Sequence, residues 1–443
     1  MIEILFQALL VTPFLWILFL GLLFFTKLPV PERYLSEGVK YFSFFMALVG
    51  LALWAATFAE APRFLLLDYE DWITVGEYRF KTRFIVDLLG ATYAFLTCAL
   101  IGIIFKFSRN YLHREEGYFR FVFLLSILLF GLIIVSFARS LDLLFAGWEL
   151  VGTTSVLLIS YFYTQNQPVR HALKAIVTYR ICDMGLLAAS AWAHHFLHST
   201  DFYLIPALVR EQHHGAQLGV RFIGIFIVWA SLAKAGQLPM SSWLPTAMEG
   251  PTPSSAIFYG ALSVHLGPFL LLRFYDFLSQ FPGLLVLIGA IGFASAAYAS
   301  LVGRTRSDAK TMLAYATITQ VGIIYLEIAL GFTSFALFHM VAHASFRTYQ
   351  FLRSSSLIQD FFENPTVEQD VRIDRPSPFG KYLTAEAKER LFIHALHGFH
   401  LDYFTGLLIR AVSAPANLYI RWEKYSMEVD RKFLKRILGR GRL

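Results

Sequence analysis

The chain has 443 residues, of which 56% are hydrophobic and only 16% are charged. A soluble globular domain carries about 25% charged residues, so this composition excludes an ordinary soluble fold. The formal net charge of +7 would suit nucleic acid, but Lys and Arg gather in short loops and in a basic tail, which favours membrane orientation. We therefore expect an all-α polytopic membrane protein.

About eleven transmembrane helices are expected, because a helix needs about 20 apolar residues to cross a bilayer. Between the second and third expected helices, residues 63–84 alternate polar and apolar side chains on both sides of Gly76. This alternation predicts a small β-hairpin outside the bilayer. The eleven expected spans lie at residues 2–26, 40–60, 84–107, 119–138, 141–163, 171–194, 221–246, 253–273, 282–302, 311–331 and 333–353.

Basic residues predict the orientation. If the N-terminus lies outside, the inner loops at 27–40, 109–120 and 304–310 collect most of the loop Lys and Arg, as the positive-inside rule requires. We expect a multi-pass protein of the cell inner membrane with a cytoplasmic C-terminus. The last stretch, residues 421–443, mixes apolar residues with Arg and Lys and predicts an amphipathic helix on the cytoplasmic surface.

Two ionisable residues lie where charge is expensive. Glu149 is about nine residues into its span, and Lys234 closes the apolar run 222–233; a charge at mid-bilayer costs about 2.5–3.5 kcal/mol and marks an ion or proton route. We expect Glu149 and Lys234 to pair as a proton switch, the alternative being a static ion pair. Pro239 and Pro245 follow and predict a discontinuous helix that lines a hydrated cavity; the alternative is a simple kink.

His339 and His343 are four residues apart and share a helical face, which Arg347 extends. Histidine titrates nearest neutral pH, so the pair predicts a proton relay; metal binding is the alternative, although no acidic or Cys ligand stands nearby. Arg347 cannot release its proton and is expected to act as a fixed charge, unless it snorkels to the interface. His265 and Lys310 are further candidates, with a packing role as the alternative for His265.

Four stretches carry a family likeness: FAGWELVGTTSVLLISYFYT, AKAGQLPMSSWLPTAMEGPTPSSA, DAKTMLAYATITQVG and FHMVAHASF. They resemble the proton-conducting membrane subunits of respiratory complex I and of Mrp antiporters. The resemblance implies an antiporter-like core of two inverted five-helix units, with a broken helix in each. It also implies proton-transfer positions, at Glu149, Lys234, Lys310, His339 and His343. Separately, no phosphate-binding, dinucleotide-binding, nucleophile or redox-centre motif is visible, so we expect no catalytic chemistry, metal or cofactor on this chain.

The chain departs from that pattern at several points. Tyr259 stands where the large complex I subunit usually has His, and Arg347 where it has Lys; the second inverted repeat is truncated and the long lateral helix is missing. The stretch YGALSVHLGPFLLLR and the length resemble the DabB family, membrane subunits of inorganic-carbon accumulation complexes. That resemblance implies a large cytoplasmic, zinc-containing, carbonic-anhydrase-like partner (DabA), whose hydration of CO2 is driven by proton entry through the membrane subunit. A complex I-type or Mrp-type subunit is the alternative, and a scaffold without transport is a third reading.

Four segments are expected from these patterns. Residues 1–80 form N-terminal transmembrane helices with the external hairpin, and residues 81–353 form the proton-conducting, antiporter-like core. Residues 354–390 form a polar cytoplasmic connector, and residues 391–443 an amphipathic C-terminal segment.

Overall fold

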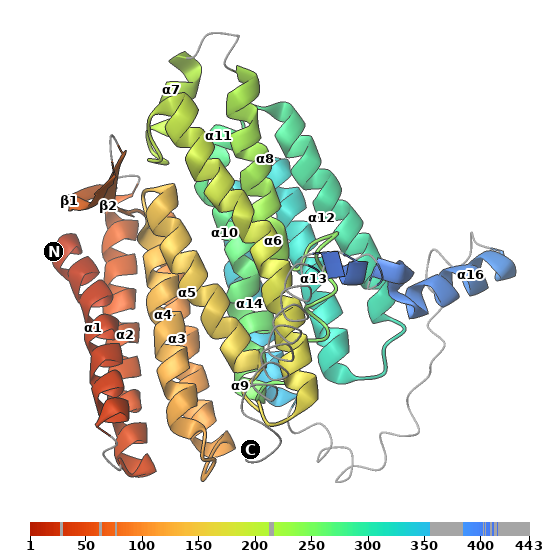
Figure 1. The fold of residues 1–443 in the computed structure, drawn as a ribbon, viewed down its shortest axis with the longest axis horizontal. Coiled ribbons are helices and arrows are strands. Elements are labelled where there is room, and N and C mark those ends of the chain that lie inside the picture. The colour runs from red at the N-terminus through yellow and green to blue at the C-terminus, as the bar shows by residue number, and fades with distance from the viewer. Residues whose placement is uncertain are drawn as a thin grey trace, which may run out of the picture.

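The computed structural model describes residues 1–26, 30–61, 64–75, 78–211, 217–354 and 384–401, with a few single positions up to 414. Within these residues the protein is a bundle of long helices with one two-stranded sheet (Figure 1). The helices of the first half are α1 (Ile2–Phe25), α2 (Glu32–Glu60), α3 (Leu88–Tyr111), α4 (Tyr118–Phe137), α5 (Leu141–Ile159), α6 (Asn166–Leu197), α7 (Ile205–Glu211) and α8 (Gln217–Lys234).

After Lys234 the helices are shorter or broken before the bundle resumes. A π-helical turn (Ala256–Ala261) and a 3-10 turn (Ser263–His265) separate α9 from α10, so this crossing segment is irregular along much of its length. The elements of this half are α9 (Thr252–Ser255), α10 (Leu266–Arg273), α11 (Tyr275–Leu278), α12 (Pro282–Gly303), α13 (Ala309–Ala329), α14 (Thr333–Arg353) and α16 (Ala385–Leu396).

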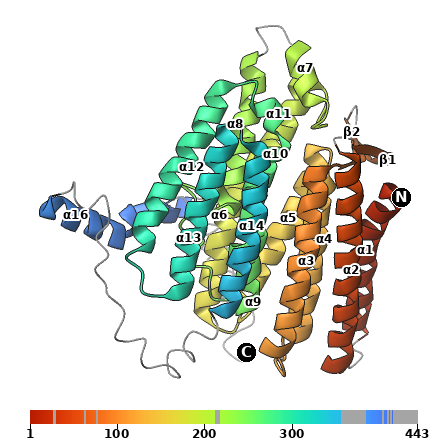
Figure 2. The same cartoon turned by 180° about the vertical axis from the view of Figure 1, so that it is seen from behind.

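The predicted fold class is confirmed. Eight helical segments within the described residues are long and apolar enough to cross a membrane: α1 to α5, the segment 252–273, α12 and α13. The three other predicted spans lie on α6, α8 and α14, which pack within the same bundle (Figure 2). The third span begins at Leu88 rather than residue 84, because residues 84–86 belong to a strand and the Asp87 carboxylate caps the helix by accepting from Gly90 N.

The predicted hairpin is also present. Strands β1 (Leu65–Val75) and β2 (Tyr78–Val86) pair antiparallel with Leu65 opposite Val86. Strand β2 therefore crosses the segment boundary that was expected at residue 80. The turn at Gly76 lies outside the described residues. Ion pairs from Arg139 to Asp68 of β1 and to Asp201 fasten the hairpin to the bundle. The bundle end that carries the hairpin and α7 is termed the hairpin side, and the opposite end the tail side (Figure 1).

The discontinuous helix predicted after Lys234 is confirmed. Helix α8 ends at Lys234, Gly236 closes it with a φ of +61°, and residues 235–251 run in turns before α9 begins. Glycine is the residue that adopts this left-handed conformation at a helix end without steric cost. Side chains satisfy the exposed backbone here: Trp243 Nε1 donates to Ala233 O at 2.8 Å and Gln237 Nε2 to Ala235 O at 3.0 Å.

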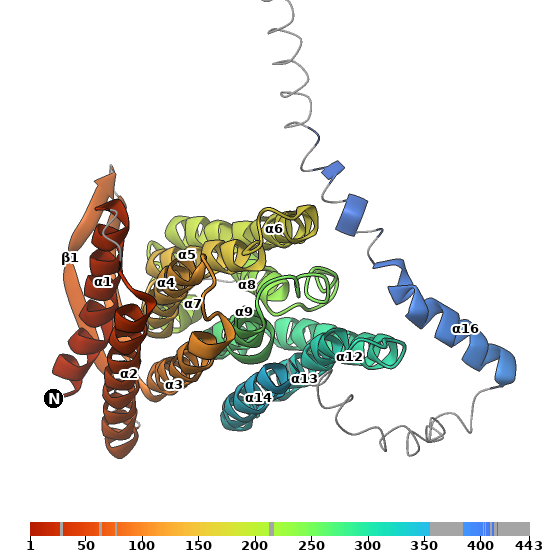
Figure 3. The same ribbon diagram turned by 90° about the horizontal axis from the view of Figure 1, so that it is seen from below.

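The tail leaves the bundle after α14. Helix α16 runs beside α12 outside the bundle (Figure 3). It begins at Ala385, inside the connector expected at residues 354–390, because Thr384 caps it by accepting from Ala387 N at 3.3 Å. Further along, Thr405 Oγ1 lies 2.8 Å from Ser242 Oγ in the stretch after Lys234. The amphipathic helix predicted at residues 421–443 lies outside the described residues.

Candidate functional site

Lys234 lies at the break of α8, in the middle of the bundle, and only 1% of the residue is exposed. Its Nζ atom lies 3.6 Å from Asp183 Oδ2 of α6 and donates to the carbonyl oxygen of Trp148 of α5 at 3.0 Å. The indole Nε1 of Trp148 in turn donates to Asp183 Oδ1 at 2.5 Å. Three helices thus hold one ammonium group and one carboxylate in a closed ring of contacts, here termed the Lys234 cluster.

Aromatic faces complete the surroundings of this ammonium group. Lys234 Nζ lies 4.9 Å from the ring centre of Trp148 and 5.0 Å from that of Tyr179, distances at which a ring face attracts a cation. At Gly152 an added Cβ would lie 2.7 Å from Lys234 Nζ. A side chain at residue 152 would therefore displace the ammonium group from this position.

Glu149, the predicted partner of Lys234, does not contact it directly, although its charge still acts on the ammonium group from a longer distance. Glu149 forms an ion pair with Arg180, and its side chain and that of Arg180 remain 20% and 46% exposed. Trp148 and Glu149 are adjacent on α5 but point in different directions. The carbonyl oxygen of Trp148 faces Lys234, while the side chain of Glu149 turns toward Arg180. Asp183 takes the place that the sequence assigned to Glu149, and a buried ammonium group needs such a carboxylate close by.

Asp183 is a residue that the sequence analysis missed, although a signal was present. It lies near the middle of the span expected at 171–194 and meets the same criterion that selected Glu149, an ionisable group at mid-bilayer. Only 2% of the residue is exposed. An inventory of every charge inside a predicted span would have found it.

His265 and His343 meet in a second cluster. His265 Nε2 lies 2.9 Å from His343 Nδ1, which brings the broken segment before α10 against α14. Arg347 Nε donates to His343 Nε2 at 3.4 Å, and Arg347 Nη1 donates to Gln350 Oε1 at 2.8 Å. Arg347 is 7% exposed and its guanidinium group faces His343, so the interpretation in which it snorkels to the interface is wrong. These residues are termed the histidine cluster.

The hydrogen bonds determine the tautomer of His343. Because Arg347 cannot accept a proton, His343 Nε2 must be the acceptor in their contact. The proton of a neutral His343 then sits on Nδ1 and is donated to His265 Nε2. The hydrogen bonds of the two imidazoles therefore run in one direction, from Arg347 through His343 to His265.

His339 lies beside this cluster with its own partners. Its Nδ1 is 2.8 Å from Glu327 Oε1 and its Nε2 is 3.1 Å from Gln320 Oε1, both on α13. The ring centres of His339 and His343 are 6.3 Å apart. The shared face predicted for the two histidines is present, but their direct contacts run to different helices. Glu327 was also missed by the sequence analysis, and its Oε2 is buried with no hydrogen-bond partner among the described residues.

Lys310 lies apart from both clusters. Its Nζ donates to Thr252 Oγ1 at 3.2 Å, and Thr252 also contacts Tyr111 OH at 3.1 Å. Thr252 begins the broken crossing segment and Lys310 lies in the first turn of α13. The structure therefore places Lys310 at the tail-side end of the segment that carries His265.

Buried polar atoms lie along the route between the clusters. Gln237 Oε1, Ser255 Oγ and Ser263 Oγ are buried without a hydrogen-bond partner among the described residues. All three belong to the connector after Lys234 or to the broken segment that leads to His265. Buried polar atoms of this kind are ordinarily satisfied by ordered water, so the irregular backbone provides sites for water in the segments that join Lys234 to His265 along the chain.

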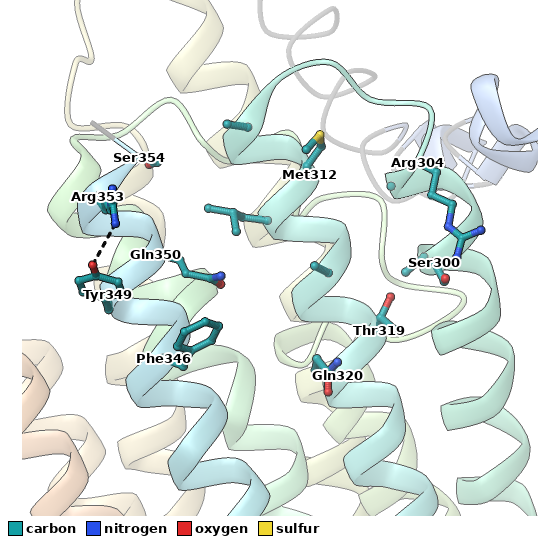
Figure 4. Close-up of a pocket in the computed structure, with 15 residues that line it drawn as sticks. Ser300, Arg304, Met312, Thr319, Gln320, Phe346, Tyr349, Gln350, Arg353 and Ser354 are labelled. Atoms are coloured by element: carbon teal, nitrogen blue, oxygen red, sulfur yellow. Dashed lines mark hydrogen bonds between the residues drawn. The ribbon is translucent and has the colours of Figure 1, made fainter. Parts of the chain in front are cut away.

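A groove of about 800 Å³ opens on the tail side between α12, α13 and α14. Figure 4 shows Gln350 extending from α14 toward α13, and Gln320 on α13 across the groove. Gln320 contacts His339 and Gln350 contacts Arg347. The groove is therefore lined by a direct partner of His339 and by a side chain that contacts His343 through Arg347.

The fold and the two clusters define a class: a multi-pass membrane protein with an antiporter-like bundle and charged residues on a broken helix. The family model described as NADH:quinone oxidoreductase/Mrp antiporter, TM, matches residues 138–371, more than half of the chain. A second model, NADH-ubiquinone oxidoreductase (complex I), chain 5 N-terminus, matches residues 72–122. The chain belongs to this family of complex I and Mrp antiporter membrane subunits.

Individual relatives agree with the family models. NAD(P)H-quinone oxidoreductase chain 5 of Picosynechococcus sp. is 31% identical over 310 residues, 68% of this chain and 47% of the relative. NADH-quinone oxidoreductase subunit L of Escherichia coli is 29% identical over 287 residues, 65% of this chain and 47% of the relative. The chain thus spans about half the length of these curated relatives.

A solved Mrp complex from Dietzia sp. shows the same fold. Its matching chain superposes with a TM-score of 0.68 at 21% identity, covering 93% of this chain and 46% of that chain. At this identity the likeness establishes the fold alone. It extends over nearly the whole of this chain, including residues outside the two family models.

Proposed function

We propose that this chain is a proton-conducting, antiporter-like subunit of a membrane protein complex. The observation that carries the proposal is Lys234, an ammonium group held by Asp183 and Trp148 at the break of α8, deep in a membrane-spanning bundle. A lysine at such a position is costly, and its partners lie on helices different from its own. A small shift of α8 against α6 therefore changes the distance to Asp183 and, with it, the tendency of Lys234 to release its proton.

The route continues toward the histidine cluster. Water bound at Gln237 Oε1 and Ser263 Oγ connects Lys234 to His265, and His265 accepts the hydrogen bond that joins it to His343. The guanidinium group of Arg347 contacts His343 at the far end of this pair and stays protonated. Lys310, Glu327 and His339 provide polar groups at the two ends of α13, where a proton enters or leaves.

For the physiological task, we favour coupling of a proton or cation gradient to inorganic-carbon accumulation. Support comes from the stretch 259–273, YGALSVHLGPFLLLR, with its resemblance to the DabB family, and from Arg347 in place of a titratable lysine. In this proposal a large cytoplasmic, zinc-containing DabA-like partner hydrates CO2, and this chain supplies the proton flux. The complex lies in the inner membrane, with the hairpin side outside and the tail side in the cytoplasm.

A second function has its own support. The family models and the named relatives belong to NADH-quinone oxidoreductases and Mrp antiporters. In that setting the same Lys234 and histidine clusters serve quinone-linked proton pumping or exchange of a cation for protons. Both functions share the proton route and differ in the partner that uses it.

Proton conduction is tested in proteoliposomes that contain the chain with the subunits that co-purify with it. An internal pH dye reports proton uptake after an imposed gradient. Wild type is expected to conduct, and Lys234→Ala to insert normally and conduct at background level. Conduction by Lys234→Ala equal to wild type would contradict the proposal.

The two tasks are separated by a growth experiment. A carbonic-anhydrase-deficient host that expresses this chain with the large protein encoded beside it is expected to grow at air levels of CO2 and to require Lys234. No growth, together with rescue of a Na⁺-sensitive or quinone-reductase-deficient host, would favour the second function.

A further inference from the structure

A polar cavity on the hairpin side is used by neither cluster. Its volume is about 650 Å³, and β2, the first turn of α5, the end of α6 and residues 197–208 form its walls. Its charged and titratable lining contains one carboxylate among cationic and imidazole groups. These side chains are Lys81, Arg83, Asp142, His194, His195 and His198. The cavity is termed the hairpin-side vestibule.

Asp142 ties the floor of the vestibule together. Its carboxylate accepts hydrogen bonds from Ser190 Oγ at 2.5 Å and from Thr200 Oγ1 at 2.7 Å, and it lies 3.5 Å from His194 Nε2. Arg83 is held separately by ion pairs to Asp68 and Asp201. The Asp142–His194 pair is therefore a carboxylate–imidazole contact that faces the cavity and joins α5 to α6.

The vestibule and the Lys234 cluster lie on the same pair of helices. Asp142 and Trp148 both lie on α5, and seven residues separate Asp183 from Ser190 on α6. Seven residues are about two helical turns, or roughly 10 Å, and return to nearly the same face. Asp183 and Ser190 therefore point to the same side of α6, one at the Lys234 cluster and one at the vestibule floor.

One apolar layer separates these two levels. Leu186 lies three residues after Asp183 and four before Ser190, and it is fully buried, at 0% exposed. Its neighbour Leu187 is 50% exposed and points out of the bundle. Leu186 therefore occupies the helix face between the vestibule and Lys234. A charge does not cross such a layer unless water enters it.

We propose that the hairpin-side vestibule is the mouth of the Lys234 site and that Leu186 is the barrier that closes it. The proposal rests on the proposed function, in that Lys234 exchanges protons. Asp142 and His194 line the mouth, and water that passes Leu186 connects the mouth to Asp183 and Lys234, so protons reach the Lys234 site from the hairpin side. When Leu186 is packed, the Lys234 site is closed to the hairpin side.

The barrier is tested with two neighbouring leucines in the same proteoliposomes. Leu186→Ser is expected to raise passive proton conductance several-fold, because a hydroxyl group and the space left by the leucine admit water. Leu187→Ser, on the exposed face, is the matched control and should behave as wild type. Adding Lys234→Ala to Leu186→Ser should abolish the leak if it runs through the Lys234 site. A leak unaffected by Lys234→Ala, or equal conductance of Leu186→Ser and wild type, would overturn the barrier.

The mouth is tested independently with a membrane-impermeant methanethiosulfonate reagent. This experiment tests the proposal by itself if the Leu186→Ser protein does not accumulate. Leu204→Cys places a thiol in the vestibule wall, and the adjacent Tyr203→Cys places one outside it; the native Cys98 and Cys182 are buried. The reagent is expected to reduce proton flux in Leu204→Cys only. Equal flux before and after reaction in both variants would refute the vestibule, while loss of flux in Lys234→Ala would still support the proposed function.

Discussion

Around Lys234 the close contacts are a carboxylate, a carbonyl oxygen and two aromatic faces, all of which attract a positive charge. Around His343 both ring nitrogens contact other basic groups, His265 and Arg347. The first region holds a cation that is already present, whereas the second repels an additional one. A single bundle thus contains one site that stores a proton and one that resists its passage.

This difference in charge around the two clusters suits them to different functions. A proton on Lys234 is stabilised until Asp183 moves away, so the Lys234 cluster is suited to switching. A proton that enters His265 meets the fixed charge of Arg347 two contacts away. The histidine cluster is therefore suited to limiting flow, which is what a subunit needs if its gradient is to do work elsewhere.

The largest expected effect is on transport, at Lys234. Lys234→Ala should lower gradient-driven proton flux by about 100-fold or more, the scale associated with loss of a proton-transfer group. The measurement is dye-reported flux in proteoliposomes. His265→Ala should lower flux less, because water can bridge a missing imidazole more readily than a missing switch. An equal loss in both variants would remove the distinction between the two regions.

The second effect compares the two carboxylates near Lys234. Asp183→Asn leaves the buried ammonium group without its partner and should destabilise the protein by about 3–5 kcal/mol. Glu149→Gln removes a partly exposed pair with Arg180 and should cost about 1 kcal/mol or less.

Thermal unfolding in detergent, followed by tryptophan fluorescence, compares these variants. The double variant Asp183→Asn with Lys234→Met should recover most of the lost stability, because it removes the unpaired charge. A greater loss of stability in Glu149→Gln than in Asp183→Asn would restore the pairing that the sequence suggested.

A smaller effect is expected at Arg347. Lysine in its place has no Nε donor and cannot contact His343 and Gln350 together. Losing one such hydrogen bond is worth about 1 kcal/mol, so Arg347→Lys should raise proton leak about fivefold while the protein still inserts. Gln350→Glu, which keeps the guanidinium group and strengthens its contact, is the matched control and should not leak. Leak and carbon uptake both equal to wild type would remove Arg347 from the mechanism.

The smallest expected signal is metal at the histidines. His343 uses Nδ1 for His265 and Nε2 for Arg347, and His339 uses both nitrogens for Glu327 and Gln320. We therefore expect less than stoichiometric zinc in the chain purified without its partner, by elemental analysis. Stoichiometric zinc that is lost in His343→Ala would show a metal site instead of a relay.

The sequence found much of the candidate site but not its connections. Lys234, His265, His343 and Arg347 were selected because ionisable residues inside apolar runs stand out locally. Asp183 was not selected, although it is also an ionisable residue inside a predicted span. Contacts such as His265 with His343 join residues 78 positions apart, and no local pattern records how two helices are rotated against each other.

By itself the sequence determined the helical membrane fold, the external hairpin and the break after Lys234. These features depend on the length of apolar runs, on strand alternation and on proline, all of which act over a few residues. Tertiary structure alone decided that Asp183 rather than Glu149 holds Lys234, and that Leu186 rather than Leu187 faces the interior. A rotation of about 100° per residue separates neighbours on a helix, so which of two adjacent side chains meets its partner is decided only when the helices pack.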